Sequence, residues 1–302
     1  MPSGFFGRAV ILGIGVVLES DSPAALKAAL EAFPNCNGDA MPWSAPPVYI
    51  VLTVNHDTET PTRENRVSGK QLHIADNGIT LLADGERGHA NCSFRIDVIG
   101  GELFRETVIT AALFLATQQG RVPVHASAVM IGDCAYVLAG RSGSGKSTLA
   151  LAANRSALPV LAEDTVFVQL DPTFTLWGAA DHIHVFEKDA PPGLEARTRL
   201  RAGRLKRAVP IEAARHSANK AALCVIARGI GVSLDPLPVE EAVCILIGEP
   251  EPGYNLFAAR MEDAIRAIAA SGCWQLTLSQ NPDAAIAALI DAFEASADRH
   301  DV

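Results

Sequence analysis

The sequence predicts an α/β protein in two parts, an α+β region over residues 1–104 and a mixed α/β region over residues 105–302. Its 302 residues, 49% of them hydrophobic, are enough to bury one large core or two modest ones. Runs rich in Val and Ile alternate with segments of helical periodicity along the chain. In the second part, a glycine-rich turn lies between an apolar strand-like run and a helix-forming run, an order typical of phosphate-binding α/β units.

The N-terminal part opens with one predicted strand over residues 8–18, which is rich in Val and Ile. The pair Ser22-Pro23 predicts the start of a helix over residues 24–33, because serine caps helix N-termini and proline fits the first turn. The Asn77-Gly78 pair between two apolar runs predicts a hairpin. The other elements expected here are strands over residues 48–54, 71–75, 79–83 and 93–99 and a helix over residues 106–117.

In the second part, residues 122–131 and 134–138 predict a hairpin that leads into the glycine-rich turn. Residues 191–207 are basic and lack periodicity, so we expect a mobile loop there. Asp283 predicts the N-cap of a last helix that ends near Ala295. The remaining elements expected are helices over residues 147–153 and 239–247 and strands over residues 158–162, 166–170, 223–227, 275–278 and part of 176–186.

Composition and charge limit the function classes. A formal net charge of −9 argues against a nucleic-acid partner, which requires a basic surface. None of the six cysteines stands in a C-x-x-C pair, so we expect reduced and mostly buried thiols in a cytoplasmic protein. The apolar run near the N-terminus fits a strand better than a signal peptide, and no run approaches the roughly 20 apolar residues of a membrane span. We therefore expect a cytoplasmic protein that has no membrane partner.

Residues 140–147 read Gly-Arg-Ser-Gly-Ser-Gly-Lys-Ser, a complete match to the phosphate-binding loop G-x-x-x-x-G-K-[S/T]. Because glycine lacks a Cβ, such a loop can turn its backbone N–H groups inward, where they bind phosphate together with the start of the following helix. Lys146 adds a positive charge between the phosphates, and the Ser147 hydroxyl is the natural Mg²⁺ ligand. The sequence therefore predicts ATP and Mg²⁺ as cofactors. The residues expected to contact the nucleotide are Gly140, Arg141, Ser142, Gly143, Ser144, Gly145, Lys146, Ser147 and Thr148.

Two acids follow the next predicted strand. Glu163 and Asp164 directly follow the strand predicted over residues 158–162, the position at which many phosphate-loop proteins hold Mg²⁺. One acid can bind the metal, with Ser147, while the other accepts the proton of an attacking hydroxyl, and the sequence leaves open which does which. His125, upstream of the loop, is a candidate to orient the pair. The catalytic set predicted is His125, Lys146, Glu163 and Asp164; the alternatives are a histidine satisfied inside the fold and acids that only end a strand.

The order of these motifs resembles a known family. His125-x-x-x-Val129, a strand, the loop, a short helix and Leu161-Ala162-Glu163-Asp164-Thr165 resemble the catalytic domain of HPr kinase/phosphorylase. The chain is more similar to the shorter HPr-kinase-related proteins, some of which phosphorylate ribosomal peptides such as lasso-peptide precursors. The resemblance spans about residues 105–300, with its specific motifs in residues 122–170.

This resemblance implies the P-loop fold shared with phosphoenolpyruvate carboxykinase rather than a Ras-like parallel sheet. It also implies His125 as the active-site histidine, Glu163 and Asp164 in place of paired aspartates, and a homo-oligomer as the family's usual assembly. The chain departs from the family in carrying Glu163 where the first aspartate usually stands. It also lacks the Glu-Ile-Arg-Gly-Leu-Gly run, and has residues 178–184 nearby instead, which argues against HPr as the acceptor and against phosphorylase activity.

A basic cluster and a histidine pair complete the candidates. Lys206-Arg207 followed by Val209-Pro210 resembles a stretch common in the HPr-kinase-related proteins. A solvated loop, a contact with nucleotide phosphates and a grip on an acidic peptide all remain open for this cluster. His182 and His184 would share one face of a strand and line a pocket. The cluster is Arg197, Arg199, Arg201, Arg204, Lys206 and Arg207, of which Arg204, Lys206 and Arg207 are candidate phosphate or substrate contacts.

The sequence thus predicts an ATP-dependent kinase that transfers phosphate to a serine hydroxyl of a peptide or small protein, with a lasso-peptide precursor as one such acceptor. Residues 1–104 would bind that substrate or regulate the kinase. Two other functions remain open: a nucleotide-hydrolysing switch or assembly factor, and a small-molecule kinase. No Asn-Lys-x-Asp run for guanine is present, which disfavours a GTPase.

Overall fold

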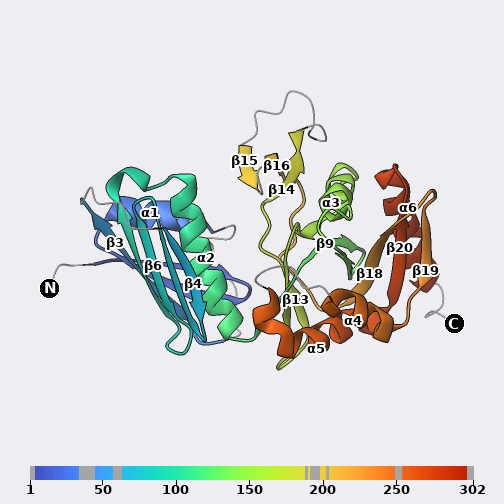
Figure 1. Cartoon of the computed structure of the whole chain (residues 1–302), viewed down its shortest axis with the longest axis horizontal. Coiled ribbons are helices and arrows are strands. Elements are labelled where there is room, and N and C mark those ends of the chain that lie inside the picture. The colour runs from blue at the N-terminus through green and yellow to red at the C-terminus, as the bar shows by residue number, and fades with distance from the viewer. Residues whose placement is uncertain are drawn as a thin grey trace. The chain divides into compact units, whose positions relative to one another are not determined.

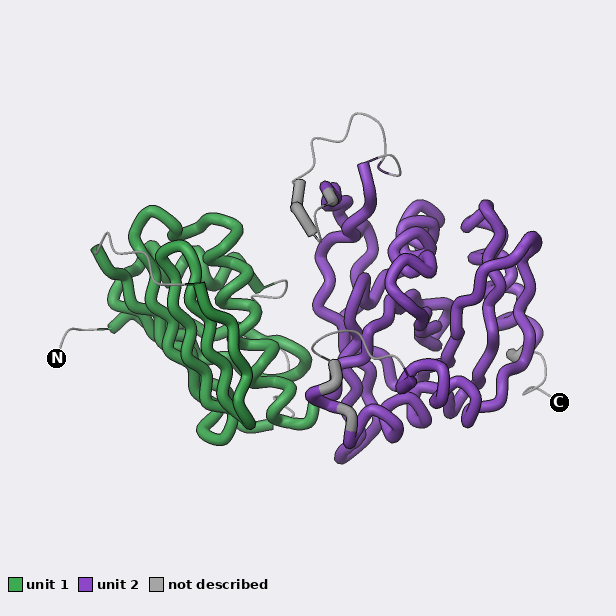
Figure 2. The backbone as a smooth tube through the Cα atoms, viewed as in Figure 1, with its two compact units in different colours: residues 1–121 green, residues 122–302 purple. Residues whose placement is uncertain are grey.

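The computed structural model describes residues 4–33, 45–56, 63–187, 190, 198–201, 204–248 and 254–297. The chain divides into two compact units, residues 1–121 and 122–302 (Figure 2). The sequence instead placed a boundary after residue 104, inside helix α2 (Glu102–Gln118). Phe104 and Val108 of α2 are fully buried, and Phe104 contacts Phe94 of the first sheet with ring centroids 4.4 Å apart. This packing keeps the whole helix in the first unit.

The first unit is a seven-stranded sheet in the order β1-β2-β3-β7-β6-β5-β4, with helices α1 (Pro23–Leu30) and α2 over one face (Figure 1). Ser22 accepts a hydrogen bond from the Ala25 N–H and so caps α1 as expected. The Asn77-Gly78 hairpin is also present. The strands are β1 (Phe5–Ile11), β2 (Ile14–Ser20), β3 (Val48–Asn55), β4 (Glu64–Ser68), β5 (Gln71–Asp76), β6 (Ile79–Asp84) and β7 (His89–Arg95).

The single strand predicted over residues 8–18 is wrong. The chain reverses at Leu12 and Gly13, whose φ angles of 50° and 72° belong to the left-handed region used by two-residue hairpin turns. β1 and β2 pair on either side of this turn. The turn escaped the sequence pattern because Leu12 is itself buried, so the apolar run continues through it.

The second unit is built on a six-stranded sheet in the order β11-β9-β10-β18-β20-β19. Alternate residues of β10 face opposite sides. Tyr136 and Leu138 pack with helices α3 (Lys146–Arg155) and α6 (Pro282–Ala297), whereas Ala135 and Val137 pack with α4 (Val239–Gly248) and α5 (Ala258–Ile268). The strands are β9 (Ala126–Ile131), β10 (Cys134–Ala139), β11 (Val160–Ala162), β18 (Ala221–Arg228), β19 (Ser233–Pro236) and β20 (Cys273–Leu278).

Two smaller sheets complete the second unit. One has the order β17-β13-β12-β8, and the other is a ribbon in the order β14-β16-β15. The ribbon occupies part of the segment expected to be a mobile basic loop, because pairing with β14 supplies hydrogen bonds that a charge run does not reveal. The strands are β8 (Arg121–Val124), β12 (Val166–Gln169), β13 (Thr175–Trp177), β14 (His182–Phe186), β15 (Thr198–Arg201), β16 (Arg204–Pro210) and β17 (Ser217–Ala218).

The helices show two further differences from the sequence pattern. Helix α5 was not predicted, and Asn281 rather than Asp283 caps α6, because the Asn281 side chain accepts hydrogen bonds from the N–H groups of Asp283 and Ala284 at 3.1 and 3.3 Å. None of the helices in the described ranges combines the length and the apolarity that crossing a membrane requires.

The described cysteines fit the expectation of buried thiols in part. Cys92, Cys134 and Cys224 are buried, Cys273 is half-buried and Cys244 is exposed. Burial raises the pKa of the Cys134 thiol to about 11, which keeps it protonated near neutral pH. Cys36 lies outside the described residues.

Gly178 gives a test of this packing. A Cβ on Gly178 would lie 1.7 Å from the backbone oxygen of Leu161 in β11. We expect Gly178→Ala to lower the free energy of unfolding by about 3 kcal/mol, because backbone must move to make room. Chemical denaturation with Gly248→Ala as control checks this, since no atom of the described residues lies within 4 Å of the Cβ position there. Equal stability of the two variants would contradict the packing described.

Candidate functional site

Several candidate residues gather at one edge of the six-stranded sheet. Strand β10 runs parallel to β18 and antiparallel to β9, which in turn runs antiparallel to β11. The carboxyl ends of β10, β11 and β18 therefore meet at the same edge, where open α/β sheets commonly bind ligands. Antiparallel β9 begins at this edge, because Ala126 pairs with Ala139. His125, the residue before β9, thus lies beside the start of the glycine-rich loop.

The loop has the backbone that its sequence predicts. Gly143 and Gly145 adopt φ angles of 81° and 119°, which residues with a Cβ rarely adopt. In the described part of the chain, no atom lies within 4 Å of the place that a Cβ would take on Gly143. The loop ends at α3, whose first residue is Lys146. The positive end of this helix therefore faces the loop, as a phosphate site requires.

Two side chains of the loop fit an anionic ligand. The Lys146 Nζ donates hydrogen bonds to the carbonyl oxygens of Gly140 and Arg141 at 2.7 and 3.1 Å. The Ser144 hydroxyl oxygen is buried and has no hydrogen-bond partner among the described residues. Buried polar atoms are rarely left in that state, so a phosphate oxygen would be a suitable partner. The residues present therefore fit the phosphates of a nucleotide.

Glu163 connects to the loop through Ser147. The Ser147 hydroxyl donates a hydrogen bond to Glu163 Oε1 at 2.8 Å, and Glu163 is only 6% exposed. The Ser127 hydroxyl donates to the backbone carbonyl of Glu163, and His184 Nδ1 lies 3.5 Å from Glu163 Oε2. The carboxylate is therefore held by side chains from α3 and β14.

Asp164 has different surroundings. His125 Nδ1 lies 3.0 Å from the Asp164 backbone oxygen and 3.7 Å from its Oδ1. The Asp164 side chain is 26% exposed, more than that of Glu163, so it is the carboxylate that solvent reaches more easily. The structure thus brings His125, Ser147, Glu163 and Asp164 together beside the loop.

The donor set for a metal is small. In the part of the chain that the structure describes, no group of three or more His, Cys, Asp or Glu side chains could hold a metal by itself. Mg²⁺ in nucleotide sites is commonly bound through one or two carboxylates together with phosphate oxygens and water. Ser147 and Glu163, joined by their hydrogen bond, fit that smaller requirement.

The basic candidates separate in the structure. Lys206 lies with its Nζ 5.4 Å from the ring centroid of Phe186, and Arg207 forms an ion pair with Glu187. Lys206 pairs with Phe186 and Ala208 with His184, so strand alternation puts Lys206 on the same face of the ribbon as His184 and Arg207 on the other. Arg204 is the first residue of β16, Arg199 and Arg201 belong to β15, and Arg197 lies outside the described residues.

Three residues near the candidate site were not predicted from the sequence or were predicted only in part. His184 was expected to line a pocket, and it lies beside Glu163, whereas His182 pairs with Asp181 at 3.0 Å. Arg228 ends β18 with its Nη2 3.5 Å from the Gly143 carbonyl oxygen. Arg228 reaches the loop because β10 and β18, which lie far apart in the sequence, pair in parallel. No local sequence pattern indicates that pairing.

Asn154 is the third residue that the sequence did not single out. It is 5% exposed, and its amide bridges α3 to the end of the ribbon. Its Nδ2 donates to the Pro210 oxygen at 3.1 Å, and its Oδ1 accepts from the Glu212 N–H at 3.0 Å. The amide thereby satisfies two backbone groups, one at the end of β16 and one in the segment that follows it.

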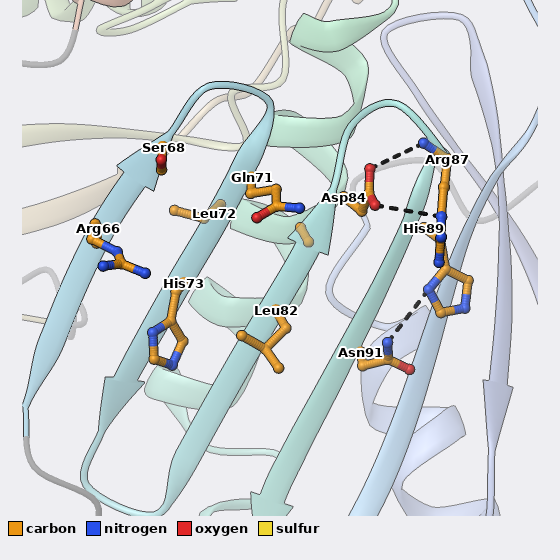
Figure 3. A pocket seen from close by; sticks show the side chains of 11 residues that line it. Arg66, Ser68, Gln71, Leu72, His73, Leu82, Asp84, Arg87, His89 and Asn91 are labelled. Atoms are coloured by element: carbon orange, nitrogen blue, oxygen red, sulfur yellow. Dashed lines mark hydrogen bonds and ion pairs between the residues drawn. The ribbon is translucent and has the colours of Figure 1, made fainter.

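The first unit has a hollow of about 370 Å³ on its sheet (Figure 3). Its charged side chains pair within the sheet: Arg87 with Asp84 at 3.6 Å and His73 with Glu64 at 3.2 Å. Such pairing offers hydrogen-bonding groups without a concentrated charge. The residues that line the hollow are Arg66, Ser68, Gln71, Leu72, His73, Leu82, Ala83, Asp84, Arg87, His89 and Asn91.

Comparison with known proteins found similarity at the level of structure alone. No family model matches the chain, and no curated protein matches it. Among solved structures, the Hpr(Ser) kinase/phosphatase from Coxiella burnetii matches with a TM-score of 0.32 at 10% sequence identity. That match covers 58% of this chain and 98% of the other. A superposition this loose does not establish a shared function. The fold itself is a mixed α/β architecture of several sheets.

The loop's fit to phosphate leads to a binding test. We expect Mg²⁺ with inorganic tripolyphosphate to raise the melting temperature of the protein by roughly 4 °C at about 100 times its Kd. Lys146→Ala should abolish the shift, because the loop loses its positive charge. Lys220→Ala is the matched control, since Lys220 pairs with Asp133 at the opposite end of β10. Differential scanning fluorimetry measures both, and an undiminished shift in Lys146→Ala would contradict the assignment.

Proposed function

We propose that this protein is an Mg²⁺- and ATP-dependent kinase that phosphorylates a hydroxyl group. One observation carries the proposal: the loop serine Ser147 is hydrogen-bonded to Glu163 at 2.8 Å, and the next residue, Asp164, lies beside His125. A nucleotide site with a metal-side acid and a second, separate acid has the parts that phosphoryl transfer to a hydroxyl needs. A loop built only to bind phosphate does not need the second acid.

Ser147 and Glu163 are assigned to the metal. Mg²⁺, when bound, supplies neutralisation of the charge on the phosphate oxygens. Glu163 suits this side because it is buried and already bonded to the loop serine. His184, 3.5 Å from its other oxygen, keeps the carboxylate oriented toward the loop. Lys146 holds the phosphates by its positive charge. Its hydrogen bonds to the carbonyl oxygens of Gly140 and Arg141 also hold the backbone of the loop in place.

Asp164 is assigned as the base. Its carboxylate is the more exposed of the two, so an acceptor hydroxyl can approach it, and it takes the hydroxyl proton onto an Oδ atom. His125 acts on Asp164 as a positioning residue, through its contacts with the backbone oxygen and Oδ1 of that residue. This division between Glu163 and Asp164 is the choice that the sequence left open.

The acceptor we propose is a serine of a peptide or small protein in the cytoplasm. The support is the resemblance of residues 122–170 to the HPr-kinase-related proteins, which makes precursors of ribosomal peptides, lasso peptides among them, the first acceptors to test. Lys206, on the same face of the ribbon as His184, suits acidic residues beside the acceptor serine. A homo-oligomer and a role of the first unit in holding the peptide belong to the same proposal.

The assay is phosphate transfer from labelled ATP to a panel of serine peptides. We expect Asp164→Asn to lower kcat by about 10²- to 10⁴-fold with little change in the affinity for Mg·ATP, because the base is lost while the nucleotide site remains. Glu163→Gln should instead raise the Mg²⁺ concentration needed for half-maximal rate. The matched control is Asp181→Asn, since Asp181 is a nearby exposed acid that pairs with His182.

Other outcomes would identify a different function. Release of inorganic phosphate without any labelled acceptor, stimulated by a protein partner, would sink the kinase proposal in favour of a nucleotide-hydrolysing switch. Labelling of free serine or a sugar but of no peptide would retain phosphotransfer and replace the acceptor with a small molecule. Equal losses of rate in Asp164→Asn and Asp181→Asn would contradict the assignment of the base.

A further inference from the structure

Residues 228–231, which join β18 to β19, border the glycine-rich loop. Arg228 Nη2 lies 3.5 Å from the Gly143 oxygen and 3.1 Å from the place that a Cβ would take on Gly145. Leu278, which ends β20, lies 2.9 Å from that same place. The ends of β18 and β20 therefore form a wall against the outer side of the loop, on the edge of the sheet where the strands end.

Ile230 stands out on this wall. It is fully exposed, with a relative exposure of 104%, higher than that of any other large hydrophobic residue described as exposed. Scattered exposed apolar residues are normal on protein surfaces. Ile230 differs because it lies two residues beyond Arg228, between two glycines, and so projects from a segment that contacts the loop.

The order of the strands indicates which part of a nucleotide would reach this wall. Within β11-β9-β10-β18, Glu163 and Asp164 follow β11, on one side of β10, and Arg228 ends β18, on the other. Under the proposed function, on which this inference rests, the transferred phosphate lies on the side of the two acids. The sugar and base then leave the loop on the side of β18.

We propose that residues 228–231 form the site for the nucleotide base, with a purine ring held between the Arg228 guanidinium and the Ile230 side chain. Guanidinium groups stack on aromatic faces, and an aliphatic side chain packs well against the other face of a flat ring. An isoleucine that is fully exposed in the free protein gains burial when the ring binds. The site thereby selects a purine nucleotide over a bare polyphosphate.

The test compares Mg·ATP with Mg²⁺ and inorganic tripolyphosphate by isothermal titration calorimetry on the full chain. We expect Ile230→Ala to raise the Kd for ATP about tenfold and to leave the Kd for tripolyphosphate unchanged, because only ATP carries a base. Ile245→Ala, on α4 and 44% exposed, is the matched control and should change neither.

A second variant separates stacking from charge. Arg228→Lys keeps the positive charge beside the loop but loses the flat guanidinium. We expect it to raise the Kd for ATP about threefold to tenfold and the Kd for tripolyphosphate less than about twofold. Because both variants change exposed side chains, their melting temperatures should match the wild type.

Other outcomes would overturn the base site, the kinase proposal or both. An unchanged ATP Kd in Ile230→Ala, or equal losses for ATP and tripolyphosphate, would overturn the base site. If the protein binds both ligands as expected but labels no acceptor, the kinase proposal fails and the base site stands. If the wild type binds neither ligand, both are overturned.

Discussion

The hydrogen bond between Ser147 and Glu163 joins the start of α3 to the end of β11, two segments that only the order of strands brings together. A carboxylate that is 6% exposed is costly to bury unless polar groups surround it. Ser147 and His184 provide those groups, and the Ser127 hydroxyl holds the backbone of the same residue. The acid can stay buried only while α3, β9 and β14 keep their places, so the chemistry at this edge depends on the packing of the whole second unit. The candidate side chains lie at strand ends and at the start of a helix, which are more rigid supports than long loops.

Local backbone features could be predicted from the sequence, and long-range strand pairing could not. The backbone of the loop at residues 140–147 could be predicted because its glycines favour the positive φ angles that Gly143 and Gly145 adopt. His125, Glu163 and Asp164 were found for a related reason, since each lies next to a strand end. Their contacts required β9 to lie between β11 and β10, which no local pattern specifies. His184 and Arg228 reach the site from strands distant in the sequence, so their partners became visible only in three dimensions.

The predicted elements that differ from the structure also differ because of long-range contacts. A buried Leu12 hid the turn between β1 and β2, because apolar periodicity ignores chain reversal when the turn residue is itself buried. The basic segment was read as a loop because charge dominates its composition, whereas β16 forms through hydrogen bonds to β14 and buries Ala208 and Val209. The boundary between the units lies after residue 121 and not after residue 104, because α2 packs on the first sheet through Phe104. In each case a tertiary contact determines the local structure, and composition alone does not reveal that contact.

Asn154 links helix α3 to the end of the ribbon in the second unit. Its amide holds the backbone at Pro210 and Glu212 from a position on the same helix whose first turn carries Lys146 and Ser147. A helix is a stiff rod over this length, so Asn154 fixes the end of β16 relative to the glycine-rich loop at the other end of α3. The ribbon strand on which Lys206 lies and the glycine-rich loop are therefore anchored to the same helix.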